Sequence, residues 1–184
     1  DICILMDRGK YFETYKKIFT QYRIPLYIEN DENIKNVMIV DILTNILRLI
    51  KAIKEDDYSS EDFIISFLSL MRSFIFEKTD EEIYHIVKNK NFLESEVVLK
   101  IKDILSKSSQ LSNYLLVEKV VVELEIYSKL ILIGDVKKNE VYLDEFLKYF
   151  KQMSDLDYTI DDFITYLKYI DEYQLKLNLS STGS

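Results

Sequence analysis

Residues 1–31, DICILMDRGKYFETYKKIFTQYRIPLYIEND, carry the most informative pattern in the chain. It opens with an unbroken apolar run over residues 2–6, which is typical of a buried strand. Apolar and aromatic side chains then recur at helical spacing over residues 11–22, with polar residues between them. Pro25, the only proline in the chain, cannot continue a helix and favours an extended residue before it. The stretch therefore predicts strand, helix and a second short strand at 24–28, which form a βαβ unit with a right-handed crossover.

The rest of the chain is predicted to be mainly α-helical, in a multi-helix bundle. Three glycines and one proline in 184 residues favour long helices with short connections, because these two residues mark most turns. Apolar residues recur at helical spacing in seven further segments. The expected helices cover about residues 34–53, 63–71, 80–87, 92–105, 114–133, 141–153 and 163–173.

Three sequence pairs predict where helices begin. Ser59 with Asp62, Thr79 with Glu82 and Thr159 with Asp162 each place a hydroxyl three residues before an acid. Such pairs supply acceptors to the first amides of a helix, and the threonine with glutamate is the capping-box pattern. We therefore expect a helix to start after each hydroxyl residue.

The most apolar stretch, residues 114–133, is predicted to be the central helix of the bundle. Its broad apolar stripe consists of Val117, Val120, Val121, Leu124, Tyr127 and Ile131. Glycine commonly ends a helix, so Gly134 predicts the stop. Near the end of the chain, leucines at 175, 177 and 179 alternate with polar residues, which predicts a possible short strand.

Three blocks of residues carry a family resemblance. The first joins Asp1 and the apolar run 2–6 to IPLYI at 24–28, the second is the apolar helix 37–49, and the third is LMRSF at 70–74 followed by TDEEI at 79–83. In this order and spacing the blocks resemble superfamily 1 DNA helicases of the UvrD, Rep and PcrA kind, and most closely the AddA and RecB branch. The second half of the chain matches only as helix.

The resemblance implies a domain organisation and a role. Residues 1–31 and 174–184 would belong to the second motor domain, 2A, and residues 32–173 would form the α-helical insertion called 2B. The chain would run from motif IV to just before motif V, so we expect a piece of a longer polypeptide. A 2B insertion helps to engage duplex DNA at the fork and to regulate unwinding, and in AddA and RecB relatives it also contacts other parts of a larger complex.

The resemblance also implies a nucleotide contact. Motif IV of the family carries an arginine that reaches the γ-phosphate of ATP, and Arg8 is the candidate here. In a gapless match Asp7 occupies that position, and Glu13 stands where the family has a second arginine. The chain contains no G-x-x-x-x-G-K-[ST] sequence, which a P-loop needs. We therefore expect no catalysis and no cofactor for this chain alone, with ATP and Mg²⁺ bound by the parent enzyme.

The charge distribution weighs against strong, autonomous DNA binding. The chain carries 24 basic and 32 acidic residues, a net charge of −8, whereas domains that grip DNA phosphates are usually basic. Two basic clusters are the candidate DNA contacts, against the alternative that they are ordinary solvated surface. The first contains Lys88, Lys90, Lys100, Lys102 and Lys107, and the second contains Arg48, Lys51 and Lys54.

Other kinds of site have little support in the sequence. His85 is the only histidine and Cys3 the only cysteine, so neither can supply the ligand set of a zinc site. The single cysteine cannot form an internal disulfide, which favours a reducing cytoplasm. The first apolar run is too short for a signal peptide, and no stretch is long and uncharged enough to span a membrane.

Two functions from different classes remain open. The first is an accessory region of an ATP-dependent DNA helicase or helicase–nuclease in repair or recombination, which the three blocks favour. The second is a helical protein–protein interaction module without a nucleic-acid role, which the net charge favours. Contacts with phosphate predict that DNA binding weakens steeply with added salt, so salt dependence separates the two.

Overall fold

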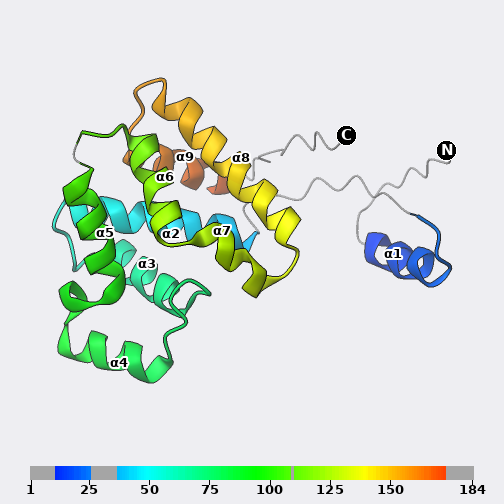
Figure 1. Ribbon diagram of the computed structural model, residues 1–184, viewed down its shortest axis with the longest axis horizontal. Coiled ribbons are helices and arrows are strands. Elements are labelled where there is room, and N and C mark those ends of the chain that lie inside the picture. Colours follow the sequence, from blue (N-terminus) through cyan, green and yellow to red (C-terminus); the bar gives the residue numbers. More distant parts are fainter. Residues whose placement is uncertain (1–10, 26–36, 109, 173–184) are drawn as a thin grey trace. The chain divides into compact units, whose positions relative to one another are not determined.

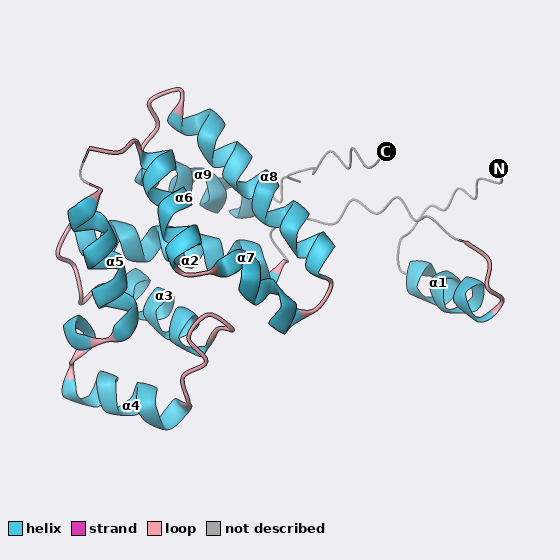
Figure 2. Ribbon diagram, viewed as in Figure 1, coloured by secondary structure: helices cyan, strands magenta, loops and turns pink. Residues whose placement is uncertain are grey.

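A computed structural model describes residues 11–25, 37–108 and 110–172 (Figure 1). The chain divides into two units, Asp1–Glu32 and Asn33–Ser184. Throughout the described residues the secondary structure is helical and no strand occurs (Figure 2). The prediction of a mainly α, multi-helix bundle is therefore confirmed.

The described part of the first unit is one helix, α1 (Phe12–Gln21). Arg23 then adopts the left-handed conformation with φ of 54°, and this ends the helix before Pro25, as predicted. Ile24 and Pro25 are in neither helix nor strand. The predicted strand at 2–6 and most of the strand at 24–28 lie outside the described residues, as do Arg8 and the leucines at 175–179.

The second unit contains a helical body, residues 37–172. Its α-helices are α2 (Met38–Lys54), α3 (Glu61–Arg72), α4 (Asp80–Asn89), α5 (Glu96–Lys107), α6 (Asn113–Glu123), α7 (Ile126–Lys129), α8 (Val136–Ser154) and α9 (Ile160–Glu172). Two short 3-10 helices, η3 (Phe92–Glu94) and η4 (Leu130–Ile133), lie between them.

The central element of this body is α2, and the prediction of a central helix at 114–133 is wrong. Helix α2 packs against α3, α5, α8 and α9 (Figure 1). Because neighbours surround it, apolar side chains are buried on every side of it. The buried residues of α2 are Ile39, Val40, Ile42, Leu43, Asn45, Ile46, Leu47, Leu49, Ile50, Ala52 and Ile53.

Residues 114–133 form α6, α7 and η4 in place of one continuous helix. The break is at Glu125, whose φ of 57° is left-handed. The change of direction buries Ile126 and Leu130 completely, while Tyr127 and Ile131 are 38% and 72% exposed. The predicted apolar stripe is therefore wrong at its last two members, because the break at Glu125 changes which residues after it face the core.

Two of the three predicted helix starts are confirmed. The Thr79 side chain accepts a hydrogen bond from the Glu82 amide at 3.3 Å, and the Glu82 carboxylate accepts one from the Thr79 amide at 2.8 Å. Thr159 and Asp162 make the same reciprocal pair at the start of α9. At α3 the cap is Ser60, whose hydroxyl accepts from the Phe63 amide at 3.3 Å, and the prediction of Ser59 is off by one residue.

Candidate nucleic-acid interface

The first predicted basic cluster begins at the end of α4. Lys88 lies over the ring of Tyr84, with its Nζ atom 5.5 Å from the ring centroid. Lys90 ends the helix in the left-handed conformation, with φ of 55°. Both lysines are exposed, and neither makes an ion pair with another described residue. Their charges are therefore available to an anion in solution.

The α5 members of that cluster are mostly neutralised within the helix. Lys100 pairs with Glu96 at 3.1 Å and Lys107 pairs with Asp103 at 2.6 Å. The hydrogen bond from Lys107 to Asp103 raises the pKa of Lys107, and the hydrogen bond from Lys100 lowers the pKa of Glu96. Lys102 instead lies over the Tyr58 ring, 5.0 Å from its centroid.

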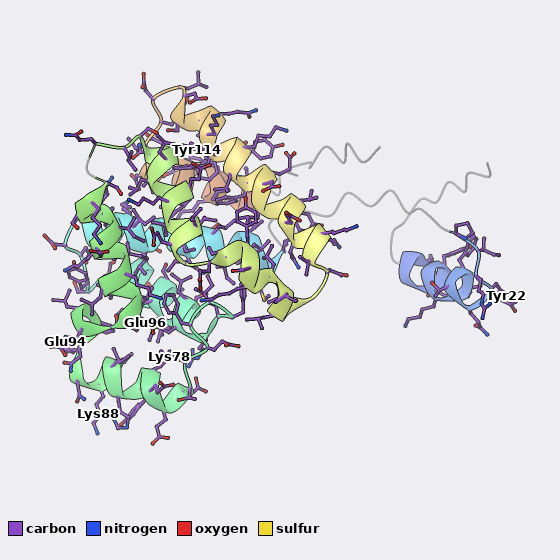
Figure 3. All side chains as sticks on the ribbon, viewed as in Figure 1. Tyr22, Lys78, Lys88, Glu94, Glu96 and Tyr114 are labelled. Atoms are coloured by element: carbon purple, nitrogen blue, oxygen red, sulfur yellow. The ribbon has the colours of Figure 1, made fainter. Side chains whose placement is uncertain are left out.

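Acidic groups are interspersed with this cluster. Figure 3 shows Glu94, Glu96 and Lys78 between α4 and α5, on the same part of the body as Lys88. Lys78 pairs with Glu96 at 3.5 Å and with Glu82 at 3.8 Å. Carboxylates therefore lie beside the lysines at this part of the body, which weakens the local positive potential.

The second predicted cluster lies along the C-terminal half of α2, and its members differ. Lys51 pairs with Asp161 of α9, and this hydrogen bond raises the pKa of Lys51. Lys54 is exposed and makes no ion pair with the described residues. Arg48 is half-buried, and its Nη1 atom lies 3.4 Å from the side-chain oxygen of Asn45. Only Lys54 among these resembles a free surface cation.

The whole helical body is acidic. Residues 37–172 contain 17 Lys and Arg against 26 Asp and Glu, a net charge of −9. Five candidate cations have no carboxylate partner among the described residues, namely the exposed Lys54, Lys88 and Lys90 and the half-buried Arg48 and Lys102. Contact between these candidate residues and DNA consequently involves few phosphates.

The sequence prediction missed an exposed apolar surface at η4 and the start of α8. Ile131 is 72% exposed, Leu132 is 55% exposed and Val136 is 40% exposed. We call these three residues the η4 surface. Gly134, whose φ is 74°, turns the chain between Leu132 and Val136. The sequence prediction placed Ile131 and Leu132 in a central helix, where they would be buried. Their exposure became apparent from the structure, in which that helix is broken at Glu125.

The structure provides little for metal or covalent chemistry. Within residues 11–25, 37–108 and 110–172, no group of three or more His, Cys, Asp or Glu side chains could hold a metal ion. His85 is exposed on α4 and contacts the Tyr84 ring, with 5.9 Å between the ring centroids. Cys3 lies outside the described residues.

No helix in the described part of the chain is both long enough and apolar enough to cross a membrane. Comparisons with protein-family models, curated proteins and solved structures give no match to this chain.

Proposed function

We propose that this chain is the accessory, 2B-like part of an ATP-dependent DNA helicase or helicase–nuclease of the UvrD type, in the AddA and RecB branch. It acts in DNA repair or recombination in the cytoplasm. The body helps to engage duplex DNA and to regulate unwinding. The parent chain holds ATP and Mg²⁺ and performs the chemistry, while Arg8 contacts the ATP phosphate only within the complete motor.

The observation that carries this proposal is the position of the two ends of the helical body. Helices α2 and α9 pack together, and Lys51 near the end of α2 pairs with Asp161 at the start of α9. Figure 1 shows α2 beginning and α9 ending on the same side of the body. A domain inserted into another must leave and rejoin its host at neighbouring points. The ends of many domains lie close together, and here this arrangement supports the proposal because it is compatible with an insertion.

The first unit adds a second reason. Tyr15 and Ile18 of α1 and Tyr22, which directly follows the helix, recur at helical spacing on one side. An amphipathic helix gains most of its stability by packing this side against a larger core. This supports assigning α1 to a larger domain, as expected for a part of the 2A motor domain.

The first test is to read the parent gene on both sides of this segment. The helicase proposal expects a G-x-x-x-x-G-K-[ST] sequence upstream and a Thr-Ile-His-x-Ser-Lys-Gly sequence just after Ser184. If neither sequence is present, the three blocks reflect helical patterning alone, and the helicase proposal is wrong.

The second test measures binding of this chain to forked duplex DNA as salt is varied. Replacing Lys88, Lys90 and Lys102 by glutamine removes three candidate phosphate contacts, which should reduce the slope of log K against log salt by about 2.7. The matched control replaces Lys100 and Lys107, whose charges are already paired, and should change the slope little. Equal effects of both sets of changes would contradict the proposed DNA contact.

A second candidate function is a protein–protein interaction module without DNA binding, and the η4 surface favours it. Exposed clusters of large apolar side chains often mark sites where another protein binds. The net charge of −9 on the body points the same way. Absence of any salt-dependent DNA binding by the chain would select this second candidate.

A further inference from the structure

The η4 surface is held outward by the residues on either side of it. Leu130 is buried and Ile133 packs against the core, so both ends of η4 are anchored. Ile131 and Leu132 lie between these anchors and are exposed. A 3-10 helix turns once in about three residues, so Ile131 and Leu132 cannot turn inward without displacing an anchor. The exposed apolar side chains are therefore a fixed feature of the fold.

Helix α8 continues this surface and adds carboxylates to it. Val136 begins the helix, and Glu140 and Asp144 follow it at intervals of four residues, which places all three along one side. The Tyr127 hydroxyl donates a hydrogen bond to Asp144 at 2.6 Å, so this side of α8 faces α7. Helix α8 also packs against η4, which directly follows α7 (Figure 1). The η4 surface and the two carboxylates therefore border one another.

The carboxylates around the η4 surface are not neutralised by the described residues. Glu140 and Asp144 are exposed and make no ion pair within residues 11–25, 37–108 and 110–172. The same is true of Asp135, directly before Val136, and of Glu125. An acidic rim therefore surrounds an apolar centre.

The lysines of this region do little to offset that rim. Lys129 donates to the backbone carbonyl of Ile75 at 2.8 Å, and Lys138 lies over the Tyr142 ring, 5.8 Å from its centroid. Lys137 is exposed and is the remaining lysine of residues 125–144. The local potential is consequently negative, and it favours a positively charged partner.

We propose that the η4 surface, together with Glu140 and Asp144, binds an amphipathic helix of another protein that carries lysine or arginine beside its apolar side. Such a helix places apolar side chains at i, i+3 and i+4 against an apolar surface. Val136 and Asp144 are separated by about 12 Å along α8, at 1.5 Å per residue. A partner that lies along α8 therefore has its basic residues about two turns from its apolar anchors.

The charges disfavour the other occupants of such a surface. A symmetric contact with a second copy of this chain would bring two acidic rims together, and like charges repel. DNA would meet the same acids with its phosphates. The inference gives the second candidate function a partner and does not require the helicase assignment. It uses none of the lysines proposed to contact DNA, so the two proposals can fail separately.

The apolar part of the inference is tested with a synthetic helical peptide of leucine and lysine, in which leucines recur at i, i+3, i+4 and i+7. Calorimetric titration should show saturable binding to this chain, and absence of binding would overturn the proposal. Leu132→Ser should weaken the binding by about tenfold. The matched control is Leu156→Ser, since Leu156 is 71% exposed between Asp155 and Asp157 but lies outside the η4 surface. Equal effects of the two substitutions would overturn the proposal.

The charge part is tested by neutralising the rim. Glu140→Gln with Asp144→Asn should weaken peptide binding by about fivefold at about 0.05 M salt, and by less at about 0.5 M. Glu55→Gln with Glu94→Gln removes the same charge from exposed positions elsewhere and should have little effect. Equal weakening by both pairs, or equal binding of a leucine and glutamate peptide, would overturn the proposal. Sedimentation that shows a dimer dissociated by Leu132→Ser would assign the surface to a second copy and would also overturn it.

Discussion

A substitution at Glu125, in the break between α6 and α7, gives the sharpest prediction. Glycine there should stabilise the protein if the helix is broken, and should destabilise it if residues 114–133 form one continuous helix. Glu125 has φ of 57°, and its side chain is exposed without an ion pair among the described residues. An L-residue in this conformation costs about 1–2 kcal/mol relative to the right-handed helix, and glycine adopts it freely. We therefore expect Glu125→Gly to stabilise the chain.

The magnitude follows from two opposing contributions. Relief of the left-handed conformation favours the folded state by about 1–2 kcal/mol, while the greater backbone freedom of glycine in the unfolded chain reduces this by about 0.5–1 kcal/mol. The two ranges leave a net expected gain of about 0–1.5 kcal/mol in the free energy of unfolding, centred on about 0.75 kcal/mol. For a domain of this size the central value corresponds to a rise of roughly 1–4 °C in melting temperature.

The assay is urea and thermal unfolding followed by circular dichroism at 222 nm. The matched control is Glu123→Gly, since Glu123 is the last residue of α6 and is also exposed. Glycine at a helical position should destabilise by up to about 1 kcal/mol. If residues 114–133 formed one helix, both variants would lose stability alike. A loss of stability in Glu125→Gly would therefore refute the broken helix.

Two further predictions concern the helix starts. Ser60→Ala should destabilise by about 1 kcal/mol because it removes the acceptor for the Phe63 amide, whereas Ser59→Ala should change the free energy of unfolding little; equal losses would show that the cap is wrongly placed. The amide and hydroxyl of Thr79 lower the pKa of Glu82 below its ordinary value. A lowered folded-state pKa gives stability that is present above the unfolded-state pKa and is lost as pH falls through the folded-state value. Unmodified protein should therefore lose more stability than Glu82→Gln between pH 6 and pH 3 in urea unfolding, and parallel pH profiles would contradict the capping box.

Local signals predicted local structure well. The reciprocal pairs Thr79 with Glu82 and Thr159 with Asp162 form as expected, because the atoms involved are three residues apart and need no tertiary partner. The cap at α3 was placed one residue early because both Ser59 and Ser60 are available. The Asp57 carboxylate accepts from both of their amides, and this turn leaves the Ser60 hydroxyl facing the helix.

The candidate interface was predicted less well, since charge lists do not show pairing. Lys51 has its partner 110 residues away in the sequence, which no local pattern reveals. Lys100 and Lys107 follow acids by four residues, and that spacing was a usable signal of neutralisation. The burial of the Arg48 Nε atom could not be anticipated, because burial of a single atom depends on the helices that pack around it.

The mainly helical class, the approximate starts of α3, α4 and α9, and the end of helix α1 before Pro25 could all be predicted from local patterns. These features depend on residues within one or two turns of each other, so periodicity and capping suffice. The central position of α2, the break at Glu125 within residues 114–133 and the return of α9 beside α2 became known from the packed structure. Residues 114–133, the most apolar stretch, were the natural candidate for the central helix. Whether a helix is central depends on how many other helices pack against it, and a local sequence pattern does not show this.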